Sequence, residues 1–266
     1  MGTTKKYSTK KFVLSLVAII LIYVFAMSLL LAAFGILFTV MVGGAVFLIV
    51  KSGNNGTLQL SYEDCPGGLL VTGVTVFETK RIVIPSEVDG VPVIGIQAGA
   101  FENNEKLTEI VLPDTLRTVE ARAFSGCTSL KEIVFPSSME YIGDEAFFGC
   151  VALERVTFGE NTRFIGHNAF SECVALTEIS ELNAEEIGMQ AFYACEKLES
   201  VTIGESVGKI GMASFYGCSA LNSLEIKGGD FVIGGEYVVT REELSMMSHM
   251  ITMLTDTYSQ YDWLRS

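Results

Sequence analysis

Cysteine is the residue of this chain most able to do chemistry, and five of the six cysteines recur at a fixed spacing. They are Cys127, Cys150, Cys173, Cys195 and Cys218. The chain has no Cys-x-x-Cys pair, and its only histidines, His167 and His249, lie far from a zinc-ligand pattern, so we predict no metal site. The regular spacing favours buried, reduced thiols that act as small apolar fillers. Disulfides between neighbouring thiols are the alternative, although parallel side chains give poor disulfide geometry.

The other reactive side chains show no arrangement that is typical of an active site. Two histidines leave no evident Ser-His-Asp or Cys-His combination, and no Gly-x-x-x-x-Gly-Lys phosphate loop occurs. Carboxylate pairs such as Glu185-Glu186 and Glu242-Glu243 are best interpreted as solvated surface. We therefore predict that the chain is not an enzyme and requires no cofactor.

Charge divides the chain at about residue 51. The first 51 residues carry five lysines and no acidic residue, whereas the other 13 of the 18 basic residues follow later, together with all 31 acidic residues. A region this acidic repels phosphate, so nucleic-acid binding is not expected.

A repeat of 23 residues must position the cysteines. Its clearest marker is one phenylalanine column, with intervals of 23, 23, 23, 22 and 23 residues: Phe101, Phe124, Phe147, Phe170, Phe192 and Phe215. No single unit of this length can bury its own apolar face, so neighbouring units must stack on one another. The sequence therefore predicts a repeat solenoid built from short parallel strands plus turns or short helices.

Alternation within the repeat predicts which side chains face inward. In residues 107–112 we expect a short strand with Ile110 and Leu112 inward and with Glu109 and Val111 outward. The Ala-Phe portion is expected in a tight turn or a short helix on the opposite side. The fourth unit lacks the proline or glycine that ends most of these strands, and we predict a local bulge at residues 179–184.

A long uncharged segment precedes the repeats. Residues 12–50 contain no charged side chain, and these 39 residues exceed the roughly 20 that a transmembrane helix needs. We predict a transmembrane helical segment over 12–50 after a basic cytoplasmic N-terminus over 1–11. The lysines favour a single-pass arrangement in the plasma membrane with extracellular repeats. Because a 39-residue helix is about twice as long as the hydrocarbon core is thick, a two-pass arrangement with cytosolic repeats is the alternative.

The remaining segments complete the predicted domain organisation. They are a linker over 51–57, an N-terminal β cap over 58–83, about six repeats over 84–227 and a C-terminal cap over 228–266. The cap is expected to hold an amphipathic helix, because Thr240-Arg241-Glu242-Glu243 is a capping box followed by apolar residues at helical spacing.

The repeat resembles the BspA-like leucine-rich repeats (type 5). The resemblance rests on Ile142-Gly143, Ala146-Phe147 and Cys150, and on the recurrences Ile165-Gly166, Ile187-Gly188 and Ile210-Gly211. It covers about residues 60–235. The resemblance implies a bacterial or protist surface protein, in some members an adhesin, that binds other macromolecules, and it names no ligand.

Two surfaces are candidates for that binding. The strand face presents Glu109, Glu132, Arg155 and Glu178, with Arg155 placed to relieve repulsion between glutamates. The turn face presents Phe148, Tyr193 and Tyr216, which follow core phenylalanines and are suitable anchors for a protein or glycan partner. We expect an adhesion-type, outward-facing, membrane-anchored protein. A cytosol-facing membrane scaffold that recruits proteins through the same repeats is the alternative.

Overall fold

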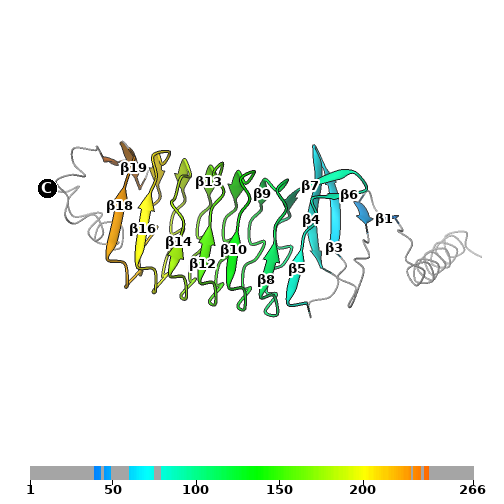
Figure 1. Ribbon diagram of the computed structural model, residues 1–266, viewed down its shortest axis with the longest axis horizontal. Helices are drawn as coiled ribbons and strands as arrows, with labels where there is room; N and C mark the ends of the chain where they lie inside the picture. Colours follow the sequence, from blue (N-terminus) through cyan, green and yellow to red (C-terminus); the bar gives the residue numbers. More distant parts are fainter. Residues whose placement is uncertain are drawn as a thin grey trace, which may run out of the picture.

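The computed structural model describes residues 39–42, 45–48, 60–74, 79–228, 230–234 and 237–239. Residues 79–234 form a solenoid whose coils stack along the long axis of the molecule (Figure 1). This confirms the predicted repeat fold. Each coil carries a strand on two of its sides, and the Ala-Phe portion forms turns rather than a short helix.

The predicted strands form the first strand face. Its strands are β5 (Arg81–Val83), β8 (Glu109–Val111), β10 (Glu132–Val134), β12 (Arg155–Thr157), β14 (Glu178–Ile179), β16 (Ser200–Ile203) and β18 (Ser223–Ile226). Ile110 is buried and Val111 is exposed, as alternation predicts. Backbone pairing on this face is parallel and divided into three blocks, β5–β8, β10–β12–β14 and β16–β18.

A second strand in each coil was not predicted. It forms the second strand face, which comprises β7 (Val91–Ile96), β9 (Thr118–Val119), β11 (Tyr141–Ile142), β13 (Phe164–Ile165), β15 (Glu186–Ile187), β17 (Lys209–Ile210) and β19 (Phe231–Ile233). These strands pair in parallel without interruption from β7 to β19. The second face therefore contains one continuous sheet.

Further strands extend this sheet at both ends. At the N-terminal end, β4 (Gly68–Val74) pairs in parallel with β7, and β3 (Leu60–Cys65) pairs antiparallel with β4. The short β6 (Glu87–Val88) also pairs with β7. At the C-terminal end, β20 (Tyr237–Val239) pairs with β19. The described part of the solenoid thus has two extra strands before β7 and one after β19.

Part of the segment predicted as a transmembrane helix is a β-hairpin. Strands β1 (Thr39–Val42) and β2 (Ala45–Leu48) pair antiparallel, and β2 lies beside β3. The helical prediction is wrong for these residues, where β-branched side chains favour strands and a Gly-Gly dipeptide separates them. Residues 12–38, the linker over 51–57 and the predicted helix after residue 239 lie outside the described residues. None of the described residues belongs to a helix that could span a bilayer.

The phenylalanine column forms the centre of the core. Neighbouring rings of Phe101, Phe124, Phe147, Phe170, Phe192 and Phe215 stack with centroids 5.0–5.4 Å apart. All six side chains are fully buried. Phe135 and Phe158 add edge-on contacts from the first strand face. The aromatic stack runs through six consecutive coils and joins them into one core.

Glycine lets the coils approach each other behind the second strand face. Gly143, Gly166, Gly188 and Gly211 each follow the isoleucine of a second-face strand. A Cβ atom built on any of them would lie within 2.6 Å of backbone atoms in the preceding coil. A larger residue therefore cannot occupy these positions without moving the backbone.

The shortened fourth unit interrupts the first strand face, at the residues where we predicted a bulge. Strand β14 ends at Ile179 and does not pair with β16. Instead, Leu182 makes an isolated parallel bridge to Ile203, and the Ser180 hydroxyl accepts a hydrogen bond from the backbone N–H of Phe158 at 2.9 Å. Although this unit has one residue fewer, Phe192 still stacks on Phe170 in the core. The missing residue is accommodated on the first strand face, where β14 and β16 do not pair.

Candidate functional site

The five repeated cysteines lie in the core as a thiol ladder, defined as Cys127, Cys150, Cys173, Cys195 and Cys218. Each is at most 3% exposed, which confirms the predicted burial. Each Sγ donates a hydrogen bond to the backbone carbonyl of the phenylalanine in the preceding coil, at 3.2–3.3 Å. Cysteine therefore fills a small apolar space and also satisfies a buried carbonyl.

Burial makes four of these thiols weak acids. It raises the pKa of Cys127 to about 12 and raises the pKa of Cys150 well above its usual value. The pKa of Cys173 and that of Cys195 rise for the same reason. Because the thiolate is the reactive form, the ladder is poorly suited to nucleophilic chemistry. Cys65, in β3, is only partly buried.

We expect the ladder to resist thiol reagents until the protein unfolds. At pH 8, the aromatic disulfide reagent DTNB should react with no more than Cys65 in the folded protein and with all six cysteines in urea. Since the unfolded thiols ionise near pH 9 and folded Cys127 near pH 12, the free energy of unfolding should fall as the pH rises from about 9 to about 12. Cys127→Ala should make this decline shallower. Rapid reaction of two or more folded thiols would contradict the prediction.

The predicted charged residues lie on the exposed side of the first strand face. Glu132, Arg155 and Glu178 are register partners on β10, β12 and β14. Arg155 Nη2 lies 2.9 Å from Glu132 Oε2, and this hydrogen bond raises the pKa of the guanidinium. Glu109 is paired with Arg81 at 2.8 Å. These exposed ion pairs reduce repulsion between coils, and each contributes little to stability.

The same face also carries an exposed apolar feature. Val83, Val111 and Val134 form a valine row on β5, β8 and β10, and they are 45%, 38% and 53% exposed. A groove of about 410 Å³ runs between β8 and β10, where backbone pairing is absent. Its lining consists of Glu109, Ile110, Val111, Leu112, Asp114, Glu132, Val134 and Pro136. Strand alternation predicts that Val111 faces outward, and the structure shows that Val83 and Val134 lie in a row with it.

The aromatic residues of the turn face do not form one cluster. Tyr193 and Tyr216 stack with ring centroids 5.4 Å apart, and both are half-buried. Phe148 is half-buried too, but one coil separates it from Tyr193, and buried Ser171 occupies the corresponding position there. The turn face therefore offers one tyrosine pair rather than three adjacent anchors.

A different pair of aromatic side chains is exposed on the second strand face. This aromatic pair consists of Tyr141 on β11 and Phe164 on β13, which are 41% and 36% exposed, with ring centroids 6.5 Å apart. The Arg163 guanidinium lies 5.6 Å from the centroid of the Phe164 ring. It also binds Glu185 through two hydrogen bonds, of 2.7 and 3.0 Å, which lower the pKa of that carboxyl.

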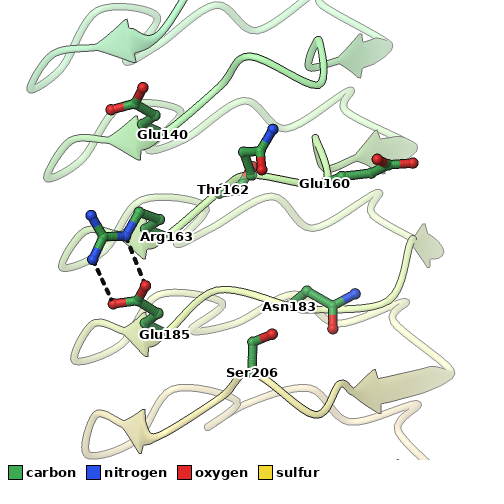
Figure 2. Close-up of a pocket in the computed structure, with 8 residues that line it drawn as sticks. Glu140, Glu160, Thr162, Arg163, Asn183, Glu185 and Ser206 are labelled. Carbon is green, nitrogen blue, oxygen red and sulfur yellow. Dashed lines mark hydrogen bonds and ion pairs between the residues drawn. The ribbon is translucent and has the colours of Figure 1, made fainter.

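Arg163 links the aromatic pair to a groove between the two strand faces, here called the corner groove. The corner groove measures about 420 Å³ and is lined by Glu140, Glu160, Asn161, Thr162, Arg163, Asn183, Glu185 and Ser206. Figure 2 shows these residues on successive coils, with the Arg163–Glu185 pair at one side. All eight lining residues are polar, and no sequence pattern predicts that these loops on successive coils line one groove.

The six matching repeats decide the classification. The family model described as "BspA type Leucine rich repeat region" matches residues 94–222 and 179–248 in six copies, which is more than half of the chain. The chain belongs to the BspA-type leucine-rich repeat family. Proteins with leucine-rich repeats generally bind protein partners and typically are not enzymes.

Solved leucine-rich repeat structures resemble this one. The leucine-rich repeat protein of T. pallidum is 28% identical, with 71% of this chain and 93% of that chain covered and a TM-score of 0.61. A leucine-rich repeat protein from Eubacterium ventriosum is 19% identical, with 62% and 40% covered and a TM-score of 0.42. A leucine-rich cell surface protein from Faecalibacterium prausnitzii is 16% identical, with 78% and 97% covered and a TM-score of 0.36. A comparison with curated proteins gave no match.

The histidine and carboxylate side chains of this leucine-rich repeat protein do not gather into a metal site within the described part of the chain. His167, which the sequence analysis considered and set aside, lies in an exposed turn. Its Nδ1 accepts a hydrogen bond from the backbone N–H of Met189 in the next coil, at 2.9 Å. His167 thus links two coils of the repeat.

Proposed function

We propose that this protein is anchored in the plasma membrane by its N-terminal segment and binds a protein partner outside the cell through the first strand face. The observation that carries the binding proposal is the valine row. Three exposed valines on neighbouring strands, bordered by the Arg81–Glu109 and Glu132–Arg155 pairs, combine an apolar centre with a charged rim. Protein interfaces have this composition.

The sequence and the hairpin support a single crossing. With strands at residues 39–42 and 45–48, the uncharged run available for a helix extends from Phe12 to Phe38. These 27 residues are long enough for one crossing of about 20 residues and too short for two. The lysines that precede this run favour a cytoplasmic N-terminus. The repeats then lie on the outer side, and an adhesion-type role at the cell surface follows.

Protease accessibility tests the orientation. In intact bacterial cells that express the full chain with a C-terminal tag, added protease should remove the tag while a cytosolic marker stays intact. Lysed cells provide the control that the tag can be cleaved. Survival of the tag until lysis would overturn the outward orientation and favour the cytosolic scaffold.

Site-specific photo-crosslinking tests the binding face in the same cells. A benzoylphenylalanine at Val134 should form a defined crosslinked protein species, because this position lies within the valine row. The matched control is Val151, which is also exposed, at 42%, but lies in a turn. Equal crosslinking from both positions, or none from Val134, would contradict binding through the first strand face.

A further inference from the structure

The corner groove adjoins the aromatic pair on the second strand face, whereas the valine row lies on the first strand face. Glu140 lines the groove and directly precedes Tyr141, while Arg163 lines it and lies over the Phe164 ring. We propose that the corner groove and the aromatic pair together form a binding site for a neutral glycan. This site is separate from the protein-binding face, and the inference does not depend on that function.

The groove lining calls for a ligand that both donates and accepts hydrogen bonds. Carboxylates of Glu140, Glu160 and Glu185 only accept, the Arg163 guanidinium only donates, and the amides of Asn161 and Asn183 do both. A sugar hydroxyl donates one hydrogen bond and accepts others, so it can satisfy all of these groups. A chain of linked sugars presents many such hydroxyls at short intervals.

Several lining side chains have hydrogen-bonding capacity left over. Within the described residues, the side chains of Glu160, Asn183 and Ser206 form no hydrogen bond with another residue. Thr162 is 97% buried, and its hydroxyl likewise has no partner there. By contrast, Asn161 Nδ2 donates to the Ser137 carbonyl at 2.7 Å and is held in place. The groove therefore combines a fixed amide with side chains that can turn to a ligand.

The aromatic pair supplies the apolar part of the site. The face of an aromatic ring carries partial negative charge, and the C–H groups on one face of a pyranose carry partial positive charge. Tyr141 and Phe164 are exposed and lie on neighbouring strands of a continuous sheet, so their positions are fixed before a ligand arrives. Preformed positions reduce the entropy lost on binding.

The charges of the groove argue against other ligands. Arg163 is already engaged by Glu185, and Glu140 is paired with Arg117 at 3.4 Å. In the part of the chain that the structure describes, Glu160 therefore stays unpaired, and no cation of the lining is free to bind a phosphate or an acidic sugar. An apolar peptide has only its backbone groups to hydrogen-bond with the lining, and its side chains would face charged groups without compensation, which is costly. A basic peptide pairs with the carboxylates, but only its backbone carbonyls can accept from the donor groups, whereas each hydroxyl of a glycan both donates and accepts. A neutral glycan satisfies donors and acceptors together.

The test measures binding of defined oligosaccharides to the full chain in phospholipid nanodiscs without glycolipids. The neutral probes are cellohexaose, maltohexaose, xylohexaose and N-acetylchitohexaose, the acidic probe is hexagalacturonate, and the basic probe is hexalysine. Titrations are followed by saturation-transfer NMR. We expect at least one neutral hexasaccharide to bind with a Kd of about 1 mM or tighter and roughly tenfold more tightly than hexagalacturonate.

Variants locate the binding on the surface. Tyr141→Ala and Ser206→Trp should each raise the Kd of the neutral hexasaccharide roughly tenfold. The first removes a ring, and the second fills the groove. Tyr141→Phe keeps the ring and should bind within about twofold of the original chain. Val151→Ala, at an exposed position in a turn outside both proposed sites, is the matched control and should change nothing. Thermal unfolding must be unaltered for each variant, and Asn183→Ala replaces Ser206→Trp if tryptophan perturbs the fold.

Three results would overturn the proposal. The first is that no neutral hexasaccharide binds, and the second is that hexagalacturonate binds as well as the neutral probes. The third is that binding is insensitive to both Tyr141→Ala and the groove variant. Binding of hexalysine alone, lost in the groove variant, would reassign the groove to basic peptides. None of these results bears on crosslinking at Val134, so the two proposals fail independently.

Discussion

Phe147→Ala is expected to lower the free energy of unfolding by about 3–5 kcal/mol. Phe147 is fully buried and stacks between Phe124 and Phe170, with ring centroids 5.0 and 5.1 Å away. Phe135 adds an edge-on contact at 5.7 Å. Alanine would leave a cavity in the middle of the stack, and the neighbouring rings cannot close it because backbone hydrogen bonds fix the spacing of the coils.

The adjacent residue provides the control for this substitution. Phe148 is half-buried, and its ring makes no ring contact within the described part of the chain. Phe148→Ala removes the same number of atoms and should cost about 1 kcal/mol or less. Urea unfolding of the full chain in nanodiscs, followed by pulse proteolysis, compares the two. Equal losses from both variants would contradict the central role of the stack.

Gly188→Ala is expected to destabilise the protein by about 1–3 kcal/mol although it adds a single carbon. The new Cβ would lie 2.5 Å from the carbonyl carbon of Gly166 and 2.6 Å from its oxygen. Both are backbone atoms, so no side chain can rotate away to make room. The strain should separate β15 from β13 and weaken the continuous sheet at its middle.

Gly208→Ala is the matched control for the added methyl group. A Cβ at Gly208 would meet only the Glu185 carbonyl oxygen, at 3.6 Å, which is an ordinary contact. Its φ is not in the left-handed region, so alanine fits and should be neutral or stabilising by up to about 1 kcal/mol. Comparable urea midpoints for Gly188→Ala and the unaltered chain would show that the coils have room for a methyl group at this position and would contradict the prediction.

The sequence predicts the solenoid because one signal recurs in each coil. The phenylalanine and cysteine columns identify the period, and alternation around Ile110 orients the first strand face. The second strand face was missed because strands such as Tyr141–Ile142 have two residues, too few to show alternation. Because this strand was not predicted, the exposure of Tyr141 on the second strand face was not predicted either.

The hairpin was missed for a different reason. Residues 39–48 continue a long apolar run, and hydrophobicity alone does not separate a buried strand from a helix. The β-branched residues around Thr39-Val40 and the Gly43-Gly44 dipeptide carried the strand signal. The corner groove could not be predicted, because its side chains come from loops on four coils and only stacking brings them together.

The two strand faces also give the solenoid unequal stiffness. The second face has unbroken backbone pairing, whereas the first face lacks it between β8 and β10 and between β14 and β16. A force applied along the solenoid axis would therefore be carried by the continuous sheet. Bending would separate the coils of the first face at these two gaps in the pairing. Val111 and Val134 lie on opposite sides of the first gap, between β8 and β10. A partner that binds both valines would bridge the gap between β8 and β10, so the solenoid would resist bending more when the partner is bound.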